Sequence, residues 1–287
     1  FSGCDDNGPA ETWARCFPKL RQVRISPDRS GELTDDYVPT DLAAISETLR
    51  VCASAVELFC NQCQIARPVV DLFIGTPFGN RLRALSFRDG QVAADDLLAC
   101  ARAFPQLRVL VLPKNELGGV SFYEALAHAR PELAYLEFCA SETTEDSHIA
   151  AACSSLSLRC LVVLDCDQIG DDPGIVDGIL GSSSAASLEE IEISKTDRGL
   201  DLGGEHVLRL VRGCPRLRVF SDFYTWLHCE SDEDADEARE ILLHRGGDAV
   251  SKHTWKPVAG TDQTLWSDAW KPPYEVRLNK YITPYTA

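Results

Sequence analysis

Cysteine and histidine side chains are the first candidates for chemistry, because thiolates and imidazoles act as nucleophiles, bases and metal ligands. The chain contains twelve cysteines and six histidines. Cys60 and Cys63 form its one C-x-x-C pair. A structural zinc site needs a second pair of ligands, and neither another C-x-x-C nor a histidine pair follows at a usual spacing. We therefore predict two buried thiols here, and no metal site.

Most of the other cysteines stand where an apolar residue would fit a repeating pattern. Cys100 in LLACARAF and Cys214 in LVRGCPRL are examples. A reduced cysteine behaves as a small buried hydrophobe. This placement favours an intracellular, reducing compartment, either cytoplasm or nucleus, with an organelle as the alternative.

The remaining polar residues form no catalytic motif. The histidines make no H-x-x-x-H or H-E-x-x-H pattern, and there is no G-x-S-x-G, Walker or G-x-G-x-x-G sequence. The 44 acidic residues are spread over the whole chain, so pairing any two of them as acid and base would be arbitrary. We predict that the protein is not an enzyme and binds no cofactor.

The charge balance restricts the class of partner. With 28 basic and 44 acidic residues, the net charge is −16. Such a surface repels phosphate backbones, which argues against nucleic acid and is compatible with a basic protein. No stretch approaches ~20 uninterrupted apolar residues, so we expect no membrane insertion. The chain begins at Phe1 without Met or a signal peptide, and we expect a processed precursor or a fragment.

A repeating pattern of apolar residues must position all of these groups. In LRVLVLPKNELGGVSFYEALAHARPE, Leu107, Leu110 and Leu112 give L-x-x-L-x-L, Asn115 follows, and a helical pattern closes the unit. The frame recurs with starts at residues 82, 107, 133, 159, 188 and 217. Arg159 holds the first position of the fourth unit, which then takes Val162 and Leu164 as its inward residues.

The earlier part of the chain fits the frame less well. KLRQVRIS, which begins at Lys19, matches it, and residues 27–81 half-fit it around Val56 and Val69, so we expect one or two irregular repeats there. Alternate residues of a strand share a face, and one unit cannot bury its apolar face alone. Neighbouring units must therefore stack.

This pattern resembles the leucine-rich repeat, L-x-x-L-x-L-x-x-N-x-L. The helical segments and the cysteines resemble the ribonuclease-inhibitor-like class and the cysteine-containing repeats of F-box proteins. The resemblance implies an α/β solenoid with a parallel β-sheet on its concave face and helices on its convex face.

We divide the chain into three parts. Residues 1–226 form the solenoid, with clear repeats over 82–226 and irregular repeats or a cap over 12–81. Residues 227–250 are an acidic helical segment, and residues 251–287 are an aromatic, proline-rich tail. Because terminal repeats must hide an open edge, we expect the tail to cap the solenoid or to contact a partner. The tail residues that we expect in such a contact are Trp255, Trp266, Trp270 and Tyr274.

The residues between the leucines are expected to face the concave surface, where a partner would bind. Read by the frame, this surface is apolar in the middle and acidic toward Glu190 and Glu192. It fits a partner that presents an apolar group beside Lys or Arg. The predicted binding residues are Arg88, Val109, Val111, Tyr135, Glu137, Leu161, Val163, Asp165, Glu190, Glu192 and Phe223.

Two functions fit these observations. The first is a non-catalytic protein-interaction module, the substrate-recognition part of an F-box-like ubiquitin-ligase receptor, whose F-box would precede Phe1. The second is a structural or accessory subunit of a large assembly, which could be organellar. An inhibitor of a basic enzyme ranks below both, because the chain has fewer clear repeats and fewer cysteines than ribonuclease inhibitor.

Overall fold

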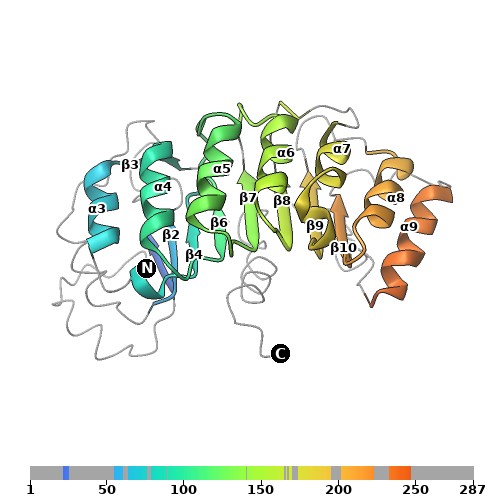
Figure 1. Cartoon of the computed structure of the whole chain (residues 1–287), viewed down its shortest axis with the longest axis horizontal. Helices are drawn as coiled ribbons and strands as arrows, with labels where there is room; N and C mark the ends of the chain where they lie inside the picture. The colour runs from blue at the N-terminus through green and yellow to red at the C-terminus, as the bar shows by residue number, and fades with distance from the viewer. Residues whose placement is uncertain are drawn as a thin grey trace, which may run out of the picture.

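The chain folds into one curved row of strand–helix units, as the computed structural model in Figure 1 shows. The structure describes residues 22–25, 55–60, 64–75, most of 79–222, and 233–246. Within this part, eight parallel strands form one sheet in chain order: β1 (Gln22–Ile25), β2 (Glu57–Cys60), β4 (Ala84–Ser86), β6 (Val109–Val111), β7 (Tyr135–Cys139), β8 (Cys160–Leu164), β9 (Glu190–Ser194) and β10 (Val219–Asp222).

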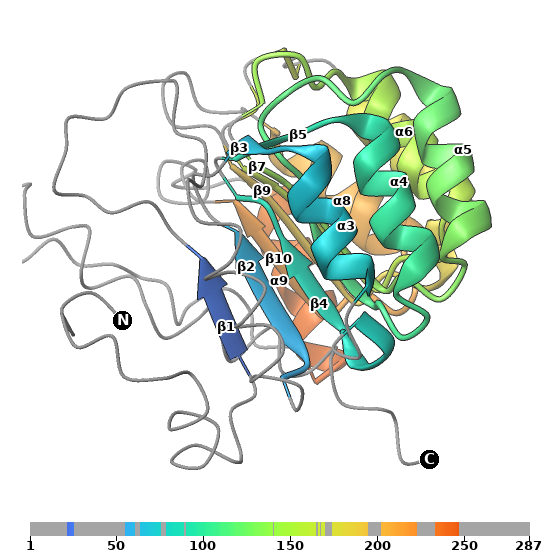
Figure 2. The same cartoon turned by 90° about the vertical axis from the view of Figure 1, so that its left-hand side faces the viewer.

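Helices cover one side of this sheet, as Figure 2 shows for the view along the row. They are α3 (Arg67–Gly75), α4 (Ala94–Ala103), α5 (Val120–Ala129), α6 (Asp146–Ser155), α7 (Gly174–Leu180), α8 (Gly204–Gly213) and α9 (Glu233–His244). Two short 3₁₀ helices, η1 (Gly79–Arg81) and η2 (Ser183–Ala186), and a two-stranded parallel sheet of β3 (Gln64–Ile65) and β5 (Gln91–Val92) complete the described elements.

One row of apolar side chains fixes the register of the whole sheet. Consecutive strands place these side chains directly opposite each other, and each is at most 1% exposed. Since burial of one such side chain contributes roughly 1.5–3 kcal/mol, the row forms the spine of the core between sheet and helices. Its members are Leu58, Leu85, Leu110, Leu136, Leu161, Ile191 and Phe220.

In the fourth repeat, the register of strand β8 differs from the predicted one. Leu161 lies opposite Leu136, and Val163 lies opposite Phe138, so both point into the core and not to the concave face. The repeat begins at the fully buried Leu158, one residue before the predicted start. All five residues of β8 are apolar, and a fully apolar strand carries no alternation from which its register can be inferred.

The irregular N-terminal part contains a second full unit. Ala55, Leu58 and Cys60 are buried at the spacing of the frame, and Ile65 follows as its last apolar position. The segment around Val56 therefore contains strand β2. The segment around Val69 is helix α3, which supplies the convex side of this unit. Of the predicted irregular repeats or cap, residues 12–21 and 26–54 lie outside the described residues.

Asn115 joins two neighbouring repeats. Its Oδ1 accepts a hydrogen bond from the Val92 N–H at 2.9 Å, and its Nδ2 donates to the Val92 and Glu116 carbonyls at 3.0 Å each. Val92 belongs to β5 of the preceding repeat. Two of its three bonds therefore cross to the neighbouring unit.

Donors from one repeat also cap the helix of the repeat before it. The last carbonyls of a helix lack partners within that helix. The Arg130 guanidinium, at the end of α5, donates to the Ala101 and Arg102 carbonyls of α4. The Ser184 hydroxyl in η2 donates to the Leu156 carbonyl after α6, at 2.6 Å. These bonds fix the angle between units and hence the shape of the sheet.

Helix α9 continues the convex layer. It lies in the predicted acidic segment 227–250 and packs on α8 through Ala235, Ala238 and Leu242. Four of its acidic side chains are exposed, so its charge is largely solvated. They are Glu233, Asp236, Glu237 and Glu240.

A candidate protein-binding face

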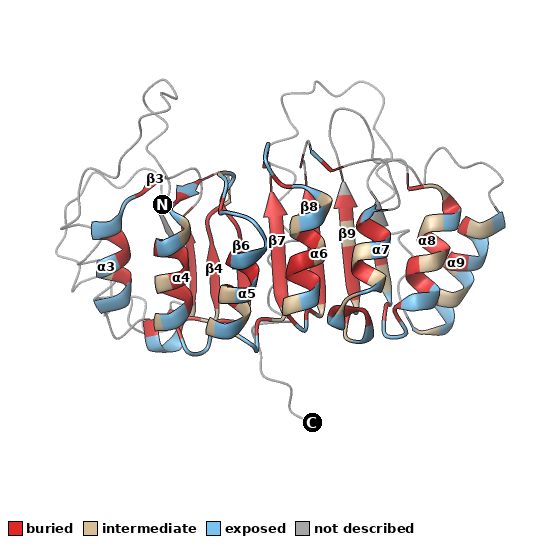
Figure 3. Ribbon diagram, turned by 45° about the horizontal axis from the view of Figure 1, so that its top comes forward, coloured by how far each residue is buried: buried red, intermediate tan, exposed pale blue. Residues whose placement is uncertain are grey.

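The face of the sheet opposite the helices carries a second cluster of buried apolar side chains. The cluster extends over β2, β4, β6, β7 and β8, and every member is between 0 and 7% exposed. Figure 3 shows that several of these strands are coloured as buried along their length. The members of this concave cluster are Phe59, Ala84, Val109, Val111, Tyr135, Cys139, Cys160, Val162 and Leu164.

A hydrogen-bonded group of three polar side chains, Arg88, Tyr135 and Glu137, lies inside the concave cluster and is called the polar node below. The Tyr135 hydroxyl donates to Glu137 Oε2 at 2.6 Å, and the Arg88 Nε donates to Glu137 Oε1 at 3.0 Å. The Nη2 of Arg88 donates to the same Oε1. Glu137 is fully buried, whereas about one fifth of the Arg88 side chain is exposed, at 21%. Because removing one partner would leave a buried charge uncompensated, this node fixes the middle of the face.

Acidic side chains flank the apolar middle. Glu57 on β2 and Glu190 on β9 are each 8% exposed, and Glu192 on β9 is half-buried. Glu190 Oε2 lies 4.0 Å from the Cys160 Sγ, so it borders the concave cluster directly. The face is therefore apolar along its centre and negative toward β9, as the sequence predicts.

The structure sorts the predicted binding residues into three groups. Val109, Val111, Tyr135, Glu137, Glu190 and Glu192 lie on the concave face, and Arg88 follows β4 and reaches that face through Glu137. Leu161 and Val163 belong to the core instead. Asp165, Phe223, Trp255, Trp266, Trp270 and Tyr274 lie outside the described residues.

Six members of the concave cluster are absent from the predicted binding residues, namely Phe59, Ala84, Cys139, Cys160, Val162 and Leu164. The last three follow from the correct start at Leu158. Phe59 follows from the unit that begins at Ala55. In both units the usable signal was an apolar residue three positions before a leucine, namely Ala55 before Leu58 and Leu158 before Leu161.

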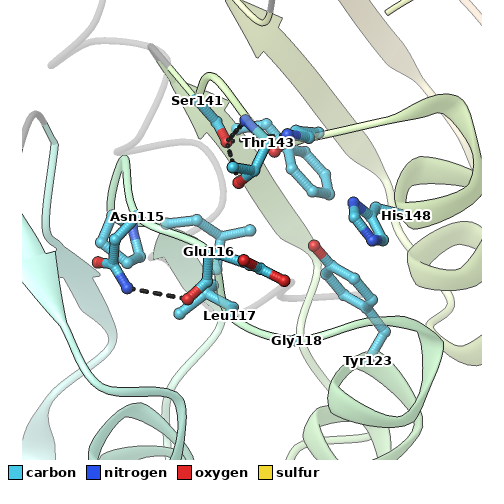
Figure 4. A pocket seen from close by; sticks show the side chains of 12 residues that line it. Asn115, Glu116, Leu117, Gly118, Tyr123, Ser141, Thr143 and His148 are labelled. Carbon is cyan, nitrogen blue, oxygen red and sulfur yellow. Dashed lines mark hydrogen bonds between the residues drawn. The ribbon is translucent and has the colours of Figure 1, made fainter. Parts of the chain in front are cut away.

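A small pocket opens at the edge of the solenoid, between the loops that follow β6 and β7. Figure 4 shows Tyr123 and His148 side by side, with Glu116 and Ser141 on the surrounding loops. The ring centroids of Tyr123 and His148 are 6.1 Å apart. Burial raises the pKa of Tyr123 above its ordinary value, so this hydroxyl stays protonated at neutral pH.

The hydrogen bonds of this pocket serve its own loops. His148 Nδ1 accepts from the Glu145 N–H at 3.2 Å, and the Ser141 Oγ accepts from the Thr144 N–H at 3.1 Å. Both groups thus accept hydrogen bonds from the backbone of the loop that leads into α6.

Buried thiols in the core are poor nucleophiles. Burial raises the pKa of Cys100 and of Cys153 to about 12, and that of Cys214 to about 11. The thiolate is the reactive form, and it is scarce at neutral pH for such groups. Among the described residues, no cluster of three or more His, Cys, Asp or Glu could hold a metal ion.

Comparisons with known proteins add a likeness to solved structures. No protein-family model matches the chain, and no curated protein sequence matches it. The solved structure of a leucine-rich repeat-containing protein, LegL7 from Legionella pneumophila, matches 83% of this chain and 95% of its own at 11% identity, with a TM-score of 0.39.

The class of protein follows from the chain itself. Repeated L-x-x-L-x-L frames place one apolar row inward, parallel strands line the concave side, and helices line the convex side. The described part of the chain is an α/β solenoid whose stacked repeats carry the L-x-x-L-x-L frame. None of its described helices is long and apolar enough to span a membrane.

Proposed function

We propose that this chain is a non-catalytic protein-recognition module and that its concave face receives a polypeptide. The observation that carries this proposal is the concave cluster. A sheet face that only has to meet water alternates its apolar core residues with polar ones. This face instead presents apolar side chains on five adjacent strands, which is the composition of a surface built to be covered.

The charges on the face favour one kind of partner. The buried glutamates on β2 and β9 and the half-buried Glu192 set a negative border beside the apolar centre. A net charge of −16 adds a long-range attraction for positive chains. A partner that inserts an apolar side chain and places Lys or Arg beside it would complement both features.

Among recognition modules, we favour the substrate-binding part of an F-box-like ubiquitin-ligase receptor. The support is the resemblance of the repeats to the cysteine-containing kind. With the corrected start at Leu158, Cys166 takes the place that Asn115 holds in the second clear repeat. A partner surface of the stated chemistry would then belong to a substrate, and an adaptor would bind elsewhere.

Affinity purification of the full-length native protein followed by mass spectrometry tests this function. We expect a specific partner that is lost from the E190K/E192K variant and retained by E124K/E205K, whose two glutamates are exposed on the convex helices α5 and α8. Equal recovery with both variants would refute the placement of the binding surface.

The co-purified proteins also distinguish the two functional classes. A Skp-type adaptor and a cullin would identify a ubiquitin-ligase receptor. One stoichiometric large complex, stable at moderate salt, would contradict the receptor assignment and identify a structural subunit.

A further inference from the structure

We propose that the concave cluster is the docking site of the chain's own C-terminal segment, residues 251–287. This inference rests on the proposed function in one respect, namely that the concave face is built to be covered by polypeptide. It goes further by naming the occupant, which would make the tail an internal competitor of any partner.

The first argument is the apolar character of the face. The concave cluster places Val109, Val111, Tyr135 and Val162 on three adjacent strands, on the side of the sheet opposite the helices α3 to α8. Parallel sheets in proteins are usually covered on both faces. The concave face is therefore suited to a covering layer of polypeptide.

The second argument is a repeated sequence in the tail. Trp-Lys-Pro occurs at residues 255–257 and again at residues 270–272. Each copy places a large apolar ring directly beside a lysine, which is the chemistry that the apolar and acidic face requires. The proline restricts the residue before it to extended conformations, and an extended segment suits a sheet surface.

The third argument is charge. Residues 251–287 carry five Lys or Arg against three Asp or Glu, a net charge of +2. The preceding 250 residues carry 23 against 41, a net charge of −18. The segment is thus opposite in sign to the rest of the chain. Glu57, Glu190 and Glu192 on the concave face supply the negative groups for its lysines.

The fourth argument is reach. Helix α9 ends at His244, and 41 residues follow Gly246. From β10 to β2 the sheet has six strand-to-strand steps, which at about 4.8 Å each span roughly 29 Å. An extended chain covers about 3.3 Å per residue, so even half of the segment is long enough to cross the concave cluster.

Thiol labelling of the full-length chain tests the proposal with an internal reference. Cys139 and Cys160 lie in the concave cluster, whereas Cys100, Cys153 and Cys214 lie in the core. Iodoacetamide modification of each thiol is followed by mass spectrometry in the wild type, in W255A/W270A, and in W266A. Trp266 is the matched control, because it belongs to the same segment and is followed by Ser, not by Lys-Pro.

We expect Cys139 and Cys160 to react slowly in the wild type and at least about tenfold faster in W255A/W270A. A tenfold change in rate corresponds to a loss of about 1.4 kcal/mol of docking free energy. The core thiols should stay protected in both proteins, which shows that the solenoid is still folded. W266A should resemble the wild type. Unchanged labelling of Cys139 and Cys160 in W255A/W270A would overturn the proposal and leave the proposed function standing, because that function is judged by partner recovery.

Zero-length cross-linking by a carbodiimide identifies the contact directly. We expect bonds from Lys256 or Lys271 to Glu190 or Glu192 within the monomer. The same bonds found only in a dimer would show that a second copy supplies the segment, and bonds only to convex glutamates would place it elsewhere. Either result would refute docking within one chain.

Discussion

Replacing Asn115 with alanine removes a side chain that hydrogen-bonds both backbone groups of Val92 in the preceding repeat. The side chain makes three bonds, at 2.9, 3.0 and 3.0 Å. The Asn115 side chain is half-buried, so water can reach part of the site after the substitution. The loss therefore concerns the joint between two repeats and leaves the apolar core unchanged.

The magnitude follows from the hydrogen bonds. A typical hydrogen bond contributes about 0.5–1.5 kcal/mol net, and a buried group left without a partner costs about 1–3 kcal/mol. With partial access of water, we expect N115A to lower the free energy of unfolding by roughly 2 kcal/mol. N115D keeps the acceptor for the Val92 N–H but directs a carboxylate oxygen at two carbonyls, so it should destabilise at least as much as N115A.

Urea unfolding of the full chain, followed by circular dichroism, measures this difference. Asn80 is exposed in η1, and N80A is the matched control, expected within about 0.5 kcal/mol of the wild type. If N115A unfolded at the same urea concentration as N80A, the bonds to Val92 would contribute nothing and the description of the joint would be wrong.

Three further perturbations test other parts of the structure. G178A should lower the free energy of unfolding by about 1–3 kcal/mol, because the new Cβ would lie 2.7 Å from the Ala150 Cβ on the neighbouring helix. G203A is the control, because its new Cβ meets nothing within 4 Å. Urea melts compare the two variants. R245A should lower the free energy of unfolding by about 1–3 kcal/mol, because the Arg245 Nη1 donates to three carbonyls, those of Val211, Cys214 and Leu217, at 2.9, 3.0 and 3.2 Å. R245K should recover only part of this loss. An unchanged urea melt of R245A would contradict a stabilising role for these bonds. Burial raises the pKa of Cys153 from its ordinary value of 9.0 to about 12 in the folded chain. The free energy of unfolding should therefore be unaffected by this thiol below pH 9 and should fall above pH 9, by up to about 1.4 kcal/mol per pH unit. In urea melts from pH 8 to 10.5, C153A should show a smaller fall with pH than the wild type.

Much of the fold was accessible from the sequence because the repeat supplies its own redundancy. Leu107, Leu110 and Leu112 define a frame, and neighbouring units confirm it without any structural information. The frame failed in β8 because all five strand residues are apolar, which removes the period-2 signal. There, only the helix end and Leu158 fix the register.

The candidate face was predicted in part. Val109, Val111 and Tyr135 alternate with leucines, so their direction was evident from the pattern. Their near-complete burial was not, because exposure depends on what lies over a face and not on the strand that forms it. The contact between Arg88 and Glu137 spans 49 residues and skips one strand, and no local pattern in a sequence reports such a pair.

Two neighbouring residues of β8 test the central claim most directly, because Leu161 points into the core and Val162 points to the concave face. We would introduce lysine at each position and measure both folding, by circular dichroism, and recovery of the partners that co-purify with the wild type. L161K should unfold the chain, since an unpaired charge in a packed core costs more than the stability of most domains. V162K should keep the native spectrum, because Val162 lies outside the core between sheet and helices and its lysine can displace a covering segment, and it should lose the partners. Retention of the partners by V162K, or unfolding of both variants alike, would contradict the assignment of the concave cluster as a recognition surface.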